Sequence, residues 1–142
     1  MIPRGAALWG ILGLVPFLAG ASLANWPLEN SLLQWLAADN RLLLHYGMVI
    51  FCFMAGVLWG FATRAEGSEA TRAYTLSVLP AGFAAFALAP VHDWQLPVMM
   101  AGFASLLLLD FWFWNEGLAP RWWLRFRIML SVVVLASLAM AL

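Results

Sequence analysis

The chain has 142 residues, of which 65% are hydrophobic and only 10% are charged, whereas a soluble domain carries about 25% charged residues. Its seven basic and seven acidic residues give a formal net charge of zero, which argues against a nucleic-acid partner. The single cysteine excludes a disulfide framework and a CxxC redox pair. The high hydrophobic fraction and the low charged fraction predict a membrane protein.

Five apolar stretches, each close to the ~20 residues that a helix needs to cross a bilayer, predict five transmembrane helices. An apolar run must be helical in lipid, because no water is present there to satisfy backbone amide and carbonyl groups. We therefore expect an all-α fold with one transmembrane domain over residues 1–142. The predicted spans are Gly5–Ala24, Leu42–Ala62, Tyr74–Val91, Leu96–Trp114 and Trp122–Leu142.

The first stretch follows Arg4 and resembles a signal peptide in outline. Its apolar core is too long for one, so we interpret it as a transmembrane helix, which Pro16 should kink. Leucine and tryptophan then recur with helical spacing between residues 28 and 36. This spacing predicts a short interfacial amphipathic helix between spans one and two.

The second stretch carries a small-residue seam, which runs from His45 through Cys52 to Thr63 in steps of four and three. Gly56 and Gly60 on this stretch also form a GxxxG motif. Small residues let helix backbones approach closely in lipid, where no hydrophobic force drives helices together. We expect the seam to serve helix packing, either within the bundle or with a partner subunit.

Prolines mark the third and fourth stretches. Pro80 lies inside the third, Pro90 closes it, and Pro97 stands in the first turn of the fourth. Between the fourth and fifth stretches, Gly117 and Pro120 bracket a tight turn. The last two spans should therefore be antiparallel neighbours.

Asp110 lies near the end of the fourth stretch, and Arg125 and Arg127 lie at similar depth in the fifth. Because a lone charge at this depth is costly, we expect a structural ion pair. Residues two apart on a helix point about 200° apart, so only one arginine can face Asp110, while the other extends toward the headgroups. We interpret the pair as an interhelical clamp, with a proton or anion relay as the alternative.

The two histidines, His45 and His92, are the candidates for a cofactor ligand, because paired imidazoles can ligate haem or a metal. Cys52 lies about 10 Å along the helix from His45, too far to share one ion, and no third ligand is evident. We therefore predict no metal and no cofactor, with interfacial hydrogen bonding as the role of both rings. The chain also has no GxSxG, no HExxH and no phosphate-binding loop, so no catalytic residue is predicted.

Arginine is distributed unevenly between the two ends of the predicted spans. Positive residues near span ends favour the cytoplasmic side. This bias predicts a cytoplasmic N-terminus and a periplasmic C-terminus. The side that holds the N-terminus carries Arg4, Arg64, Arg72, Arg121, Arg125 and Arg127, and the other side carries Arg41.

Four segments of the chain, 13–17, 46–60, 77–80 and 120–127, carry short sequence patterns, with "YGxxIxxFxxGxxWG" in the second and a segment similar to "PxWYLRLR" in the fourth. Together they resemble the membrane family of unknown function that bacteria share with mitochondrial transmembrane protein 69. The chain departs from the family at Trp123, where tyrosine is usual, and at Cys52, where a small polar residue is usual. The resemblance implies a membrane of bacterial or mitochondrial type and brings no catalytic residues.

We predict a non-enzymatic protein of the bacterial inner membrane that is an accessory subunit or assembly factor of a larger energy-converting complex. Its partners would be the lipid bilayer and, through the seam of span two, that complex. One alternative is a small oligomeric transporter or channel, because proline-broken helices can expose backbone groups to a substrate. A further alternative is a haem-, quinone- or pigment-binding protein with its site near His45 and His92.

Overall fold

The computed structural model describes residues 1–26, 29–88 and 93–142. These residues form helices and no strand, which confirms the predicted all-α class. Pro90 and His92, which the sequence analysis singled out, lie outside the described residues. The α-helices are α1 (Arg4–Leu12), α2 (Val15–Asn25), α3 (Ser31–Ala37), α4 (Arg41–Ala62), α5 (Gly67–Phe83), α6 (Gln95–Asn115) and α7 (Trp123–Ala139), with a 3₁₀-helix η1 (Ala38–Asn40) and a π-helix η2 (Ala84–Leu88).

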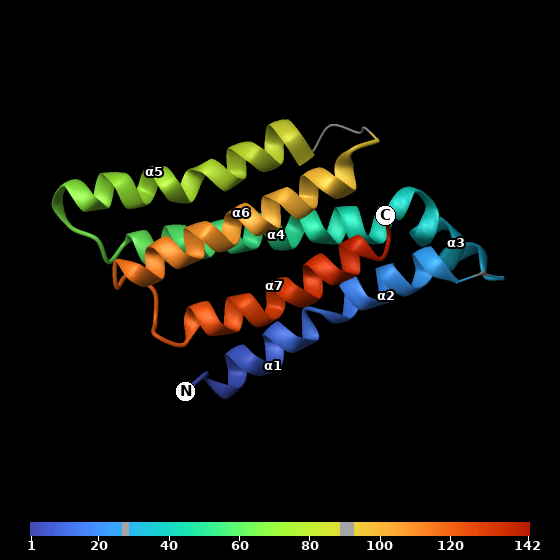
Figure 1. Ribbon diagram of the computed structural model, residues 1–142, viewed down its shortest axis with the longest axis horizontal. Coiled ribbons are helices and arrows are strands. Elements are labelled where there is room, and N and C mark those ends of the chain that lie inside the picture. Colours follow the sequence, from blue (N-terminus) through green and yellow to red (C-terminus); the bar gives the residue numbers. More distant parts are fainter. Residues whose placement is uncertain (27–28, 89–92) are drawn as a thin grey trace.

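The long helices lie side by side as one elongated bundle (Figure 1). Helices α1 and α2 follow one another along the same direction, next to α7. Helix α4 packs against α2, α5 and α6, and α6 packs against α7 as the tight turn between them predicted. The N-terminus lies at one end of the bundle and the C-terminus toward the other (Figure 1).

The core lies where α2, α4 and α6 meet. Phe103 of α6 is almost fully buried, and its ring packs edge-on against Phe17 of α2 at 6.0 Å and against Phe51 of α4 at 5.5 Å between ring centroids. Such edge-to-face pairs are favourable because the positive edge of one ring meets the negative face of the other. At Gly47 of α4 a Cβ atom would collide with the sulfur of Met99, so a larger residue there would require the flexible Met99 side chain to move.

The first predicted span is two helices with a break at Gly13 and Leu14. Pro16 explains where the break falls, because its ring clashes with the carbonyl four residues earlier, which belongs to Leu12, the last residue of α1. The hydroxyl of Tyr46 on α4 donates a 2.9 Å hydrogen bond to the carbonyl oxygen of Gly13. A neighbouring helix thus satisfies one of the backbone groups that the break exposes.

The predicted amphipathic helix corresponds to α3, which follows an N-cap at Asn30. The side-chain oxygen of Asn30 accepts hydrogen bonds from the backbone amides of Leu32 and Leu33 at 2.9 and 3.4 Å. Leu32 and Trp35 are 62% and 57% exposed, and no residue of α3 is buried. The helix therefore presents its apolar side chains outward at the end of the bundle.

Within the described residues, three helical stretches are long and apolar enough to cross a membrane, rather than the five predicted, and they are Arg4–Asn25, Ser31–Ala62 and Gln95–Asn115. Helix α5 stops as an α-helix at Phe83, and the π-helix η2 continues from Ala84. Helix α7 has 17 residues. At 1.5 Å per residue such a helix spans about 26 Å, slightly less than a ~30 Å hydrocarbon core. Three such stretches are consistent with a membrane protein.

Candidate functional site

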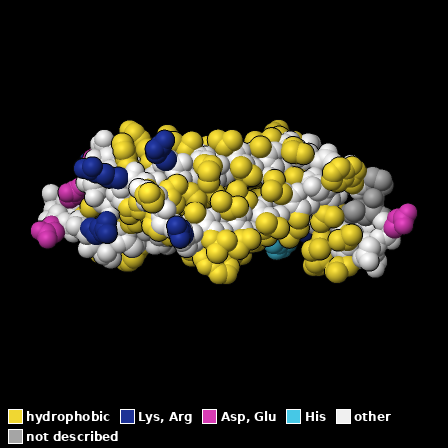
Figure 2. Space-filling view, turned by 90° about the horizontal axis from the view of Figure 1, so that it is seen from below, with side chains coloured by type: hydrophobic (Ala, Val, Ile, Leu, Met, Phe, Trp, Pro, Cys, Tyr) yellow, Lys and Arg dark blue, Asp and Glu magenta, His cyan; other side chains and the backbone are white. Residues whose placement is uncertain are grey.

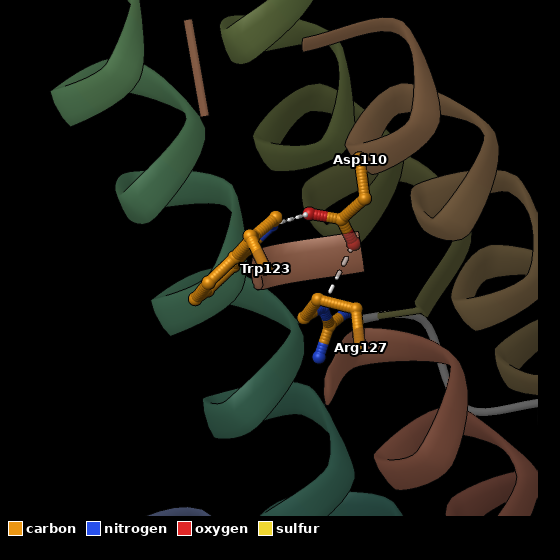
Figure 3. Close-up of polar contacts among 3 residues, drawn as sticks. All are labelled: Asp110, Trp123 and Arg127. Carbon is orange, nitrogen blue, oxygen red and sulfur yellow. Dashed lines mark hydrogen bonds and ion pairs between the residues drawn. The ribbon is translucent and has the colours of Figure 1, made fainter. Parts of the chain in front are cut away.

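A buried ion pair joins α6 to α7 (Figure 3). The Nε of Arg127 donates to Oδ2 of Asp110 at 2.7 Å, and the two side chains are 4% and 2% exposed. The indole Nε1 of Trp123 donates to the other carboxylate oxygen, Oδ1, also at 2.7 Å. Trp123 and Arg127 can both donate to the carboxylate of Asp110, one to each oxygen, because residues four apart lie on the same face of a helix.

Of the two arginines predicted near Asp110, the structure brings only Arg127 to the carboxylate. Arg125 is exposed on another face of α7, as the angle between positions two apart requires. The sequence analysis did not assign Trp123 to this cluster. Its spacing of four from Arg127 was the available signal, but an interfacial role is the usual one for tryptophan near a span end.

Two buried polar atoms beside this cluster have no hydrogen-bond partner: Nη2 of Arg127 and Oγ of Ser131. Both residues line a cavity of about 310 Å³. Native structures leave few buried polar groups unpaired, so each such group calls for an explanation. The cavity is otherwise lined by apolar and aromatic residues of α1, α2, α4, α6 and α7 and the α1–α2 break, namely Ala6, Trp9, Gly10, Gly13, Leu14, Phe17, Ile50, Phe53, Met54, Val57, Phe103, Trp123, Phe126, Leu130 and Val134.

The cavity exists because α1 lies against α7 and stays apart from α4. At Gly10 a Cβ atom would collide with the ring of Phe126, so α1 approaches α7 as closely as a glycine allows. Trp9 and Phe53, on opposite walls, are 73% and 64% exposed and also line the cavity. The cavity therefore opens at the surface of the bundle between α1 and α4.

The glycine motif of α4 faces away from the rest of the chain. Gly56 and Gly60 are exposed, and a Cβ atom at either position would meet no heavy atom within 4 Å. The other seam positions His45, Val49 and Cys52 are exposed as well. At these positions the seam therefore does not pack within the bundle.

His45 lies at the opposite end of α4 from the ion pair and takes part in a local contact. Its Nδ1 is 2.8 Å from the carbonyl oxygen of Arg41, one turn earlier. Among residues 1–26, 29–88 and 93–142, no three His, Cys, Asp or Glu side chains are grouped closely enough to hold a metal ion.

A family model described as "Protein of unknown function (DUF3429)" matches residues 2–142. That range includes the ion pair, the cavity and the outward face of α4. Neither the search of curated proteins nor that of solved structures found a match.

Proposed function

The chain belongs to the family Protein of unknown function (DUF3429), and we propose that it is a non-enzymatic accessory subunit or assembly factor of a larger energy-converting complex. We place it in the inner membrane of a bacterium, one of the two membrane types that the sequence resemblance implied. The observation that carries this proposal is the outward-facing glycine motif of α4. The membrane setting has support of its own.

We propose that the bundle crosses the membrane five times, with α1 and α2 together forming one crossing. Hydrophobic side chains cover the middle of the molecule, and arginine side chains gather toward one end (Figure 2). Helix α5 passes directly into η2, so the helical rod extends beyond Phe83 to Leu88. For the 17-residue α7, local thinning of the bilayer accommodates a small mismatch at modest cost.

The arginine-rich end should be cytoplasmic, and single-cysteine labelling tests this. In a Cys52→Ala background, Glu29→Cys should react with a membrane-impermeant maleimide in intact cells, because it precedes α3 at the predicted periplasmic end. Glu116→Cys, in the exposed turn after α6, should react only after the membrane is permeabilised. The Cys52→Ala parent is the unlabelled control. Labelling of both positions from outside, or the reverse pattern, would contradict the proposed threading.

The outward face of α4 has the features of a helix–helix contact in a membrane. Glycines four residues apart let a partner helix approach the backbone closely, and van der Waals packing then stabilises the pair. Phe53 and Trp59, exposed by 64% and 49%, also belong to the outward surface of α4. Such residues supply large contact areas to a neighbouring helix. A helix of a partner subunit is therefore the occupant we propose for this face.

Leucine at Gly56 or Gly60 should release the partner without unfolding the chain. The open space beyond both glycines means that a larger side chain meets nothing within the bundle. It would hold a partner helix away, and we expect at least a tenfold drop in co-purification from native membranes, equivalent to about 1.4 kcal/mol. Quantitative mass spectrometry after extraction in mild detergent measures this drop.

Gly82→Leu on α5 is the matched control, because a Cβ atom there also meets open space. Its co-purifying partners should be retained at the level of the unmodified chain. Recovery of the unmodified protein without any partner would refute the accessory role, as would equal losses in the Gly56→Leu and Gly82→Leu variants.

A further inference from the structure

We propose that the cavity between α1, α4 and α7 binds a neutral, largely apolar molecule through a carbonyl oxygen. This inference goes beyond the accessory role and does not rest on Gly56 or Gly60, although Phe53 belongs both to the outward surface of α4 and to the cavity wall. It rests on the two buried, unpartnered polar atoms of Arg127 and Ser131, the charge balance around them and the apolar character of the cavity walls.

The two polar groups point to one hydrogen-bond acceptor. Arg127 and Ser131 are 4% and 2% exposed, yet Nη2 of the first and Oγ of the second have no partner. The residues are four apart on α7, so they share one helix face, and both residues line the same cavity. A guanidinium only donates and a hydroxyl can donate, whereas a carbonyl oxygen accepts through two lone pairs. One carbonyl oxygen in the cavity can therefore satisfy both groups.

The charge balance favours a neutral ligand over an anion. The positive charge of Arg127 is already compensated by Asp110, 2.7 Å away, and both side chains are buried. A carboxylate or phosphate entering the cavity would add a second negative charge without a counter-ion, and burying an unpaired charge is costly. A ketone, quinone or ester carbonyl accepts the same hydrogen bonds without that penalty.

The remaining walls of the cavity favour a ligand that is largely apolar. Phe17, Phe103 and Phe126 contribute aromatic rings, and the volume of about 310 Å³ is at the small end of the range for ligand pockets. The opening between Trp9 and Phe53 lies on the side of the bundle, so in the proposed membrane setting it faces lipid. A ligand would enter sideways from the bilayer. Lipid-soluble quinones and the acyl esters of phospholipids share the required chemistry.

Binding should be measured on the full-length protein in detergent, by native mass spectrometry and tryptophan fluorescence. The probes are decylubiquinone, a phosphatidylcholine with ester-linked chains and its ether-linked analogue, which lacks the carbonyl. At least one carbonyl probe should bind saturably. Preference for decylubiquinone would identify a ring carbonyl, and preference for the ester over the ether lipid would identify an acyl carbonyl.

Ser131→Ala should weaken binding about five- to tenfold, the effect of losing one hydrogen bond. Without ligand, this variant should unfold no more easily than the unmodified protein, because the hydroxyl it removes is unpartnered. Ser137→Ala is the matched control, since Ser137 is equally buried on α7 but donates to the carbonyl of Val133 at 2.9 Å. Its affinity for the probes should be unchanged.

Ser131→Leu fills part of the cavity and should abolish binding, with thermal unfolding used to show that the variant is folded. The proposal is overturned if neither carbonyl probe binds saturably, or if Ser131→Ala binds as tightly as Ser137→Ala. Neither result would bear on co-purification through α4, so this inference and the accessory role can fail separately.

Discussion

Replacing Asp110 with alanine should lower the free energy of unfolding by about 3–5 kcal/mol, which is the typical effect of removing one partner from a buried ion pair. The variant leaves the guanidinium of Arg127 charged and buried, and it also removes the acceptor of the Trp123 indole. Denaturant unfolding in mixed micelles, followed by tryptophan fluorescence, measures the loss.

A second replacement should restore most of that stability. An Asp110→Leu, Arg127→Met double variant removes both charges of the pair, and exchanges of this kind are often neutral or stabilising. Arg125→Met, on the same helix but exposed, should change stability by no more than about 0.5 kcal/mol. If Asp110→Ala were as stable as Arg125→Met, the carboxylate would not be the clamp between α6 and α7, and the relay alternative would gain support.

Phe103→Ala should destabilise the bundle by about 3–5 kcal/mol, the range for truncating a buried aromatic side chain. The ring is 1% exposed and contacts Phe17 and Phe51, so one truncation removes contacts between α6 and two other helices. The same unfolding measurement applies. Phe86→Ala is the control, because that side chain is 86% exposed and its truncation leaves no internal void. Equal losses in the two variants would show that the core does not lie at Phe103.

Helix positions were most predictable where an apolar run is bounded by polar residues. The second predicted span, Leu42–Ala62, differs from α4 by one residue, and the fourth, Leu96–Trp114, differs from α6 by one residue at each end. Helix α5 begins at Gly67, before the apolar run starts at Tyr74, and the signal for this start was Ser68 as a possible N-cap followed by Glu69 rather than hydropathy. Polar residues can continue a helix outside the hydrocarbon region, so hydropathy alone does not mark where such a helix begins.

The ion pair could be predicted in outline, because a lone carboxylate inside an apolar stretch requires a partner and only two arginines lie at a similar depth. The choice of Arg127 depended on the rotation of α7 about its axis, which packing determines. The cavity could not be predicted, because its walls come from residues 6 to 134 and depend on how α1 is held away from α4. The π-helix η2 could not be predicted either. Pro80 indicates that one backbone hydrogen bond of this helix is missing, but packing against neighbouring helices determines the local helix type.

In the proposed membrane setting, the order of synthesis places a constraint on the clamp between α6 and α7. Asp110 leaves the ribosome 17 residues before Arg127, so α6 would first reach the insertion machinery with a carboxylate that has no counter-ion. Delivering that helix alone into lipid is unfavourable, whereas α6 and α7 together carry the buried carboxylate with its arginine partner. The short separation between donor and acceptor thus favours insertion of both helices as one pair.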